Sequence, residues 1–258
     1  MHQVNAVLAI AQRDFMKLLR DPARLVSSLI FPLIFITVLG GSLQASFGSA
    51  DFNLLTYTFT GVLAQTLFQS SATGVISLIS DREEDFSQEM FITPISRYSI
   101  IFGKTAGETM VALPQGFALV MLAFALGVGM TFPRALALVP FAIVACLLGA
   151  AFGVVVLSNL RNQRSANQVF PFLILPQFFL AGVFNPIADL PPVLGFLSAM
   201  APMRYAVDLM RSAYYAGSEE YDRVVLLSPV TNLIIIAALF AVFLSIGTAM
   251  FVRKERNR

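Results

Sequence analysis

The chain has 258 residues, of which 57% are hydrophobic and 12% are charged, and its formal net charge is +2 at pH 7. This hydrophobic fraction exceeds the usage of soluble globular proteins and excludes a water-soluble domain. The single cysteine, Cys146, excludes a disulfide framework within the chain, and the single histidine, His2, excludes histidine-based catalysis inside the membrane.

An amphipathic segment opens the chain. Between Val4 and Leu19 apolar residues recur at helical spacing, and polar residues fill the other face. We expect a helix at residues 4–20 that lies in the headgroup plane of the membrane. Charged side chains stand where a cleavable signal would have its apolar core, so we expect no such signal. They are Arg13, Asp14, Lys17 and Arg20.

Apolar segments fill most of the remaining chain. A membrane-spanning helix needs about 20 apolar residues to cross about 30 Å of hydrocarbon. The sequence predicts an all-α membrane protein with six transmembrane helices in one domain, residues 1–258. The predicted spans are 25–43, 54–79, 108–129, 135–158, 169–185 and 229–252.

The basic residues predict the orientation of these spans. Six spans place both termini on one side, and positive residues near span ends are retained in the cytoplasm. Thirteen of the 17 lysines and arginines fall on the side of the termini. We therefore expect a multi-pass protein of the cell membrane with both termini cytoplasmic, and no nucleic-acid partner. The four on the other side are Arg134, Arg204, Arg211 and Arg223.

The second span is rich in hydroxyl and amide side chains. Four of them fall on or near one helical face. Unsatisfied polar groups in hydrocarbon cost several kcal/mol, so this stripe is expected to face protein or a water-filled cavity. Two interpretations stay open, a translocation path and hydrogen bonding between helices. The four residues are Thr58, Gln65, Gln69 and Thr73.

Residues 81–104 form the most distinctive cytoplasmic segment. Five carboxylates precede an apolar patch of Met90, Phe91 and Ile92. A short helix with acids on one face and these anchors on the other suits docking on a soluble partner. The alternative is an ordinary solvated loop. The carboxylates are Asp81, Glu83, Glu84, Asp85 and Glu89.

Gly103-Lys104-Thr105 reproduces the end of a phosphate-binding P-loop. That motif needs a glycine five residues before Gly103, and Tyr98 stands there. We favour an ion pair between Lys104 and Glu108, one helical turn away. A transport role for Glu108 in an internal cavity is the second interpretation.

The later spans carry packing and aromatic signals. Gly149 and Gly153 of the fourth span form a G-x-x-x-G pattern that favours close helix packing. The fifth span contains two prolines and a run of phenylalanines that includes Phe178 and Phe179. Clustered rings can form a dry constriction in a pore. Lipid-facing phenylalanine is the alternative.

An external segment, residues 186–228, separates spans five and six. Residues 193–203 are apolar but too short to cross, and prolines bracket them. This pattern predicts an extracellular re-entrant helical hairpin. Arg204, Asp208 and Arg211 follow at a spacing that allows a charge ladder along one helical face. We expect the ladder to lock an external gate, with substrate contact as the alternative.

Three segments resemble recurring blocks of type-2 ABC exporter permeases, the membrane subunits of drug, lipid-linked glycan and antibiotic-resistance exporters. They occur in the order of the family and together run from end to end of the chain. They are RDFMKLLRDPARLVSSLIFPLIFITVLG (13–40), EMFITPISRYSIIFGK (89–104) and NPIADLPPVLGFLSAMAPMRYAVDLMR (185–211).

The resemblance implies a role for each segment. Residues 4–20 would be the interfacial connecting helix, and residues 81–97 would hold a coupling helix that contacts an ABC ATPase subunit. The second and fifth spans would line the path, through Thr58, Gln65, Gln69, Thr73, Phe178 and Phe179. The expected coupling contacts are Glu83, Glu84, Phe86, Glu89, Met90 and Phe91.

The resemblance also implies that this chain is not an enzyme and carries no cofactor, because ATP and Mg²⁺ would bind to the separate ATPase. The active assembly would be two permeases, either identical copies or paralogues, with two ATPases. The expected function is export of a hydrophobic or amphipathic substrate out of the cytoplasm. An ATP-independent secondary transporter or channel is the alternative, although we find neither internal repeats nor a central acidic residue. A structural assembly factor would not need the acidic loop or the polar second span.

Overall fold

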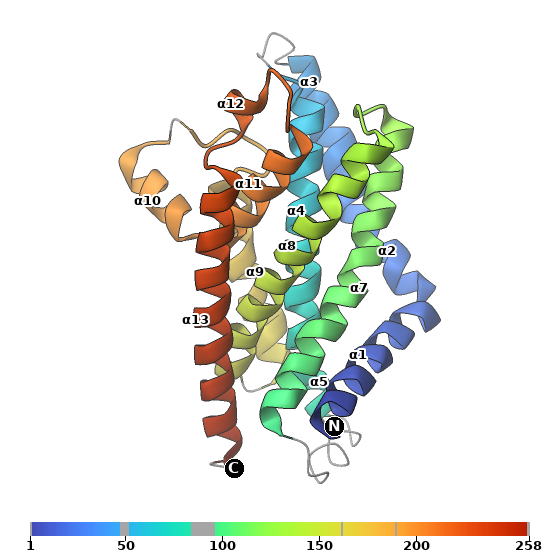
Figure 1. Ribbon diagram of the computed structural model, residues 1–258, viewed down its shortest axis with the longest axis vertical. Coiled ribbons are helices and arrows are strands. Elements are labelled where there is room, and N and C mark those ends of the chain that lie inside the picture. Colours follow the sequence, from blue (N-terminus) through green and yellow to red (C-terminus); the bar gives the residue numbers. More distant parts are fainter. Residues whose placement is uncertain (1, 47–51, 84–95, 161, 189, 257–258) are drawn as a thin grey trace.

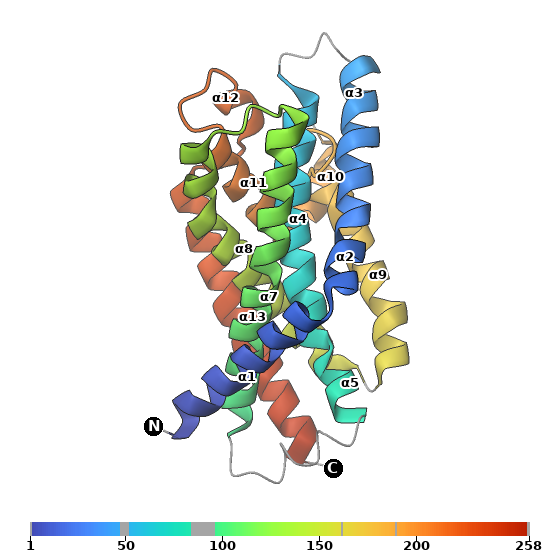
Figure 2. The ribbon, with the colours of Figure 1, turned by 90° about the vertical axis from the view of Figure 1, so that its right-hand side faces the viewer.

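The computed structural model describes residues 2–46, 52–83, 96–160, 162–188 and 190–256, and these form an all-helical bundle without strands. Figures 1 and 2 show long helices running side by side, with most of the short helices at one end. The helices are α1 His2–Arg20, α2 Pro22–Ile34, η1 Phe35–Gly40, α3 Gly41–Ser46, α4 Leu54–Ile76, α5 Leu78–Glu83, α7 Arg97–Leu126, α8 Phe132–Asn159, α9 Gln163–Leu180, α10 Pro192–Met200, α11 Pro202–Tyr214, α12 Tyr221–Val224 and α13 Pro229–Arg256.

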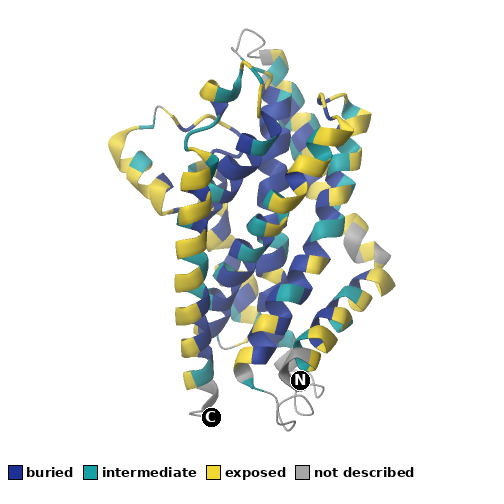
Figure 3. Ribbon diagram, viewed as in Figure 1, coloured by how far each residue is buried: buried dark blue, intermediate teal, exposed yellow. Residues whose placement is uncertain are grey.

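Helix α4 lies at the centre of the bundle (Figure 3). In its most apolar stretch of 18 residues, 78% of the residues are buried. Helix α8 packs closely on it through two glycines. A Cβ atom at Gly149 would meet the carbonyl oxygen of Phe68, and one at Gly153 would lie 2.6 Å from the carbonyl oxygen of Ala72. The predicted packing role of the G-x-x-x-G pattern is confirmed, because only glycine allows the two backbones to approach this closely.

The six-span count is not confirmed. In the described ranges, four helices are long and apolar enough to cross a membrane, Leu54–Ser80, Tyr98–Leu126, Phe132–Asn159 and Tyr221–Arg253. A fifth is added only if α10 and α11, bent by 86° at Ala201, count as one broken span.

The two predicted spans that fail this test have identifiable interruptions. In the first span, helix α2 contains Pro32 and passes into the π-helical turn η1, so its apolar helical part is only Val26–Gly40. Helix α9 begins with polar turns and contains Pro171 and Pro176. Hydropathy counted along the sequence does not register such breaks in backbone geometry.

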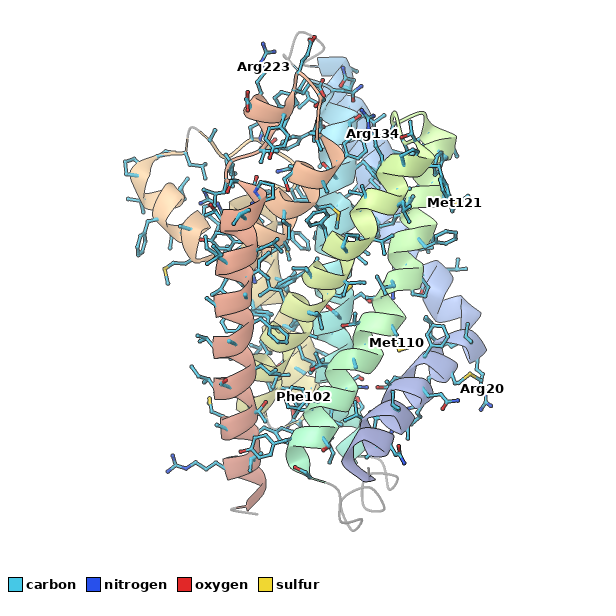
Figure 4. All side chains as sticks on the ribbon, viewed as in Figure 1. Arg20, Phe102, Met110, Met121, Arg134 and Arg223 are labelled. Atoms are coloured by element: carbon cyan, nitrogen blue, oxygen red, sulfur yellow. The ribbon has the colours of Figure 1, made fainter. Side chains whose placement is uncertain are left out.

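The two chain ends lie at the same end of the bundle in both views (Figures 1 and 2), as an even number of crossings requires. Two of the four arginines predicted for the other side, Arg134 and Arg223, lie at the opposite end (Figure 4). Their separation agrees with the predicted charge asymmetry. The cytoplasmic location of the termini and the extracellular location of the α10–α11 bend stay predictions.

Helix α1 is amphipathic as expected and crosses the lower part of α7 obliquely (Figure 2). One side of it packs against α7, where Ala11 and Leu18 are buried. Leu8, Met16 and Leu19, on the rest of its surface, are exposed. The helix therefore has two apolar contacts, one with the bundle and one suited to the membrane interface.

Substitution Gly153→Ala should destabilise the bundle by about 1–3 kcal/mol, because the added Cβ overpacks against the α4 backbone. We expect a lower unfolding temperature for the purified chain in detergent. The matched control is Gly41→Ala, since a Cβ at Gly41 meets nothing within 4 Å. Equal unfolding temperatures for the two variants would contradict the close packing of α4 and α8.

Candidate translocation pocket

A pocket of about 440 Å³ lies between α2, α4, α7 and α9. Its volume is in the range of small-molecule sites, about 300–1,000 Å³. The lining residues are Ser28, Phe31 and Pro32 of α2; Gln65, Thr66, Gln69, Ser70 and Thr73 of α4; Gln115 of α7; and Phe170, Pro171, Ile174, Leu175 and Phe178 of α9.

The polar wall of the pocket comes mainly from α4. Gln65, Gln69 and Thr73 follow one another at intervals of four residues and therefore share a helical face. The side-chain amide of Gln65 donates a hydrogen bond of 2.6 Å to Oε1 of Gln69. Across the pocket, α7 contributes Gln115, which is buried. The wall thus presents amide groups from two helices to one space.

Two buried oxygens of this wall have no hydrogen-bond partner among the described residues. They are Oε1 of Gln65, whose residue is 2% exposed, and Oγ1 of Thr66. Buried polar atoms in native proteins nearly always have a partner, and leaving one without costs about 1–3 kcal/mol. Both oxygens are closed to solvent, so they lie behind the surface of the pocket.

The opposite wall is aromatic and joins α2 to α9. The ring centroids of Phe31 and Phe178 lie 6.4 Å apart. Phe35 extends the cluster, with its centroid 4.1 Å from that of Phe31 and 4.9 Å from that of Phe184. Phe184 also packs edge-on against Phe178. The cluster forms an apolar wall at one side of the pocket.

Four of the six predicted path residues line the pocket: Gln65, Gln69, Thr73 and Phe178. The other two do not. Thr58 lies two turns from Gln65, where α4 packs against Gly40 of η1, and it is fully buried. Phe179 is 62% exposed, because one residue rotates a helix by about 100° and turns its ring away from the pocket.

Sequence reasoning missed the contributions of α2 and α7. Ser28, Phe31 and Pro32 belong to the first predicted span, which offered no polar stripe. Gln115 is an isolated amide in an otherwise apolar part of α7, and that isolation was the available signal.

A buried ion cluster lies below the pocket, where α1, α4 and α7 meet. Nζ of Lys104 lies 2.8 Å from Oε1 of Glu108, so the predicted ion pair is confirmed. Nζ also lies 3.0 Å from Oδ2 of Asp14 on α1. Asp14 is paired in turn with Arg13 at 2.8 Å. The cluster leaves no place for phosphate at Gly103-Lys104-Thr105, which lies inside α7.

Small residues bring the three helices together around these charges. A Cβ at Gly107 of α7 would lie 2.9 Å from Cα of Ala11, and one at Gly103 would lie 3.2 Å from Cα of Val7. On α4, a Cβ at Gly74 would meet the carboxylate of Glu108. Met110 and Met121 of α7, labelled in Figure 4, are exposed, whereas Lys104 and Glu108 are buried. The charges are therefore held on the protein side of α7.

The predicted charge ladder on α11 is wrong. The described part of the chain has no ion pair among Arg204, Asp208 and Arg211. Arg204 donates to Oγ of Ser198 at 3.1 Å. Asp208 and Arg211 each bind groups on other elements. Those groups are distant in sequence but lie closer to the two side chains than the next charged residue on the same face of α11.

Asp208 and Arg211 tie α11 to its surroundings. Asp208 accepts hydrogen bonds from the backbone N–H groups of Leu226 and Leu227, at 2.8 and 2.9 Å, and from the amide of Asn232 at 2.8 Å. Arg211 is 1% exposed and donates to the carbonyl of Gly182 at 2.7 Å. Its guanidinium also lies 3.5 Å from the ring centroid of Tyr57 on α4. Their role at an external gate stays a prediction.

Of the predicted coupling residues, Glu83 is the last residue of α5. The others, Glu84, Phe86, Glu89, Met90 and Phe91, lie outside the described residues. The chain leaves α5 and enters α7 at the end of the bundle that also holds both termini (Figure 2).

Comparison with known proteins decides the family. Residues 5–215 match the family model described as ABC-2 type transporter. The chain belongs to the ABC-2 type transporter family. This match covers most of the chain, from α1 to the end of α11, and includes all four helices that line the pocket.

Relatives named as transport permeases match this chain over most of its length. The transport permease ycf38 of Cyanophora paradoxa is 24% identical over 220 residues, which cover 83% of this chain and 76% of the relative. The protein of the same name in Porphyra purpurea is 25% identical over 220 residues, covering 82% and 74%. Membership in the ABC-2 family indicates the membrane component of an ABC transporter, which is not itself catalytic and pairs with an ABC ATPase subunit.

Substitution Lys104→Met should destabilise the permease by about 3–5 kcal/mol, because it leaves two buried carboxylates without their shared cation. The double variant Lys104→Met/Glu108→Met should recover part of that loss, since one uncompensated charge is removed. The measurement is the unfolding temperature of each variant in detergent. If the double variant were the less stable of the two, the cluster would not be held by charge pairing.

Proposed function

We propose that two copies of this chain, or this chain and a paralogue, work with two ABC ATPase subunits to export a hydrophobic or amphipathic molecule from the cytoplasm. The single observation that carries this proposal is the pocket, which brings the polar stripe of α4 and the aromatic side chains of α9 into one space within a chain of the ABC-2 family.

The chemistry of the pocket suits such cargo. An amphipathic molecule needs hydrogen-bonding partners for its polar part and an apolar surface for the rest. The amides of Gln65, Gln69 and Gln115 offer the first, and the rings of Phe31 and Phe178 offer the second. The Gln65–Gln69 hydrogen bond lies within α4 and does not join two helices, and Gln115 and Thr73 also line the space.

The surface beside the pocket supports a second permease copy. Helices α2 and α9 border the pocket and carry large exposed apolar side chains, so a partner permease seated there would cover both helices and enclose the pocket. Among these side chains are Val26, Ile30 and Leu33 of α2 and Phe172, Leu175 and Phe179 of α9.

The proposed coupling segment, residues 81–97, is joined along the chain to two helices that line the pocket. It begins within α5, which follows α4, and it ends at the first residue of α7. Helix α4 carries Gln69 and helix α7 carries Gln115, so a displacement imposed between them would move both walls. The ion cluster of Lys104 binds α1 to the same region of α7. This continuity supports a path from an ATPase contact at residues 81–97 to the pocket.

Replacement of Glu89, Met90 and Phe91 together by alanine should abolish substrate-stimulated ATPase activity in the co-purified complex. The apolar anchors of the ATPase contact would be lost, while the bundle would keep its unfolding temperature. Stimulated ATPase activity that survives the triple change would contradict the coupling assignment. The matched control is replacement of Glu219, Glu220 and Tyr221, at the opposite end of the bundle, by alanine.

Filling the pocket should stop transport. In the variant Ser70→Trp an indole would occupy the pocket, and we expect ATP-dependent uptake of the neutral dye Nile red into inverted membrane vesicles to fall to background. The control is Phe172→Trp, which places an indole on an α9 residue that is 79% exposed. Equal uptake by the two variants would place the path elsewhere. Uptake that persists without the ATPase would favour the ATP-independent alternative.

A further inference from the structure

The lining of the pocket combines polar and apolar side chains but contains no charged or titratable acid or base. None of its lining residues, all within the described ranges, is Asp, Glu, Lys, Arg or His. Glu108 lies against Gly74, next to Thr73 on α4, but its carboxylate is paired with Lys104. The charges of the nearby ion cluster pair with one another, so the cluster offers the pocket no counter-ion.

The polar groups that do face this space can both donate and accept. A glutamine amide supplies two N–H donors and a carbonyl acceptor, and a threonine hydroxyl supplies one donor and two acceptor positions. Oε1 of Gln65 and Oγ1 of Thr66 are buried and unpartnered among the described residues. A ligand would reach these two atoms only after their side chains turn, so its N–H or O–H groups pair first with the amides of Gln69 and Gln115, which line the pocket.

An anion in the same place would lose more hydration free energy than the neutral amides restore. Moving a fixed charge from water into a site with aromatic walls removes its hydration, and neutral amides replace only part of that loss. Ionised groups inside membrane proteins accordingly pair with opposite charges or face water-filled cavities. Phe31, Phe170 and Phe178 give the pocket its apolar walls, and no lining side chain provides a counter-ion.

We infer that this pocket selects its cargo by charge: it binds an uncharged amphipathic molecule whose amide or hydroxyl groups pair with Gln69 and Gln115, and it rejects one with a fixed negative charge at that point. This inference rests on the proposed function for the role of the pocket. It adds the chemical class of the cargo, which excludes a carboxylate or phosphate group seated between α4 and α7.

A matched pair of fluorescent probes tests the inference. The first probe is 11-(dansylamino)undecanoic acid and the second is its primary amide, so the two differ only in the charge of one end at pH 9, where the acid is ionised. Binding to the full-length chain in nanodiscs is followed by dansyl fluorescence, with protein-free nanodiscs subtracted to remove partition into lipid. We expect the amide to bind at least tenfold more tightly than the acid.

Variants of Gln69 distinguish recognition from general stability. Gln69 is only partly buried, so it tolerates a change of charge better than Gln65. Gln69→Leu should weaken binding of the amide at least fivefold, and Gln69→Lys should reverse the preference by giving the carboxylate a counter-ion. The control is Gln168→Leu on the exposed side of α9, outside the pocket lining, which should bind as the unmodified chain does.

Several results would overturn the inference. Equal binding of the two probes, tighter binding of the acid, fluorescence equal to that of protein-free nanodiscs, or an unchanged preference in Gln69→Lys would each do so. The assay contains neither ATP nor an ATPase, so it is separable from the proposed function. Charge selection with failed ATPase coupling would contradict only the proposed function, and ATP-driven export of the acid with no preference would contradict only this inference.

Discussion

The enclosure of α4 is the constraint on which the rest of the structure depends. This helix carries more hydroxyl and amide groups than lipid can accommodate, because each polar group left in hydrocarbon without a partner costs several kcal/mol. The fold surrounds it with α7, α8, α9, α11 and η1. Contact as close as that of Gly149 with Phe68 is needed to leave no lipid between the helices.

Charged residues fix the two ends of this central helix. At one end the cluster of Lys104 and Glu108 packs against Gly74, and at the other Arg211 lies over the ring of Tyr57. Each charge is buried with partners, since an isolated buried charge is far less stable. At the end that holds Arg211, Asp208 also joins α11 to α13, because it accepts a hydrogen bond from Asn232. Helix α4 is thereby held at both ends, and the pocket lies between these anchors.

The sequence predicted features that depend on one helix and missed those that depend on how helices are rotated against each other. The stripe of Gln65, Gln69 and Thr73 follows from helical periodicity alone, as does the Lys104–Glu108 pair. The position of Gln115 depends on the rotation of α7, which its contacts with α1 and α4 set. The partners of Arg211 lie on α4 and in the turn after α9, so spacing along α11 could not reveal them.

The pocket lies between a fixed side and an adaptable side of the bundle. On the fixed side, α4 and α8 meet backbone to backbone at Gly149 and Gly153, and such contacts do not slide without clashes. On the other side, α2 contains Pro32 and leads into a π-helical turn, and α9 contains two prolines. Proline and π-turns remove regular backbone hydrogen bonds, so these helices can bend at lower cost. Rearrangement of the pocket should therefore move α2 and α9 relative to an unchanged α4–α8 pair, and the aromatic contact between Phe31 and Phe178 is the part of the wall that such a motion would open first.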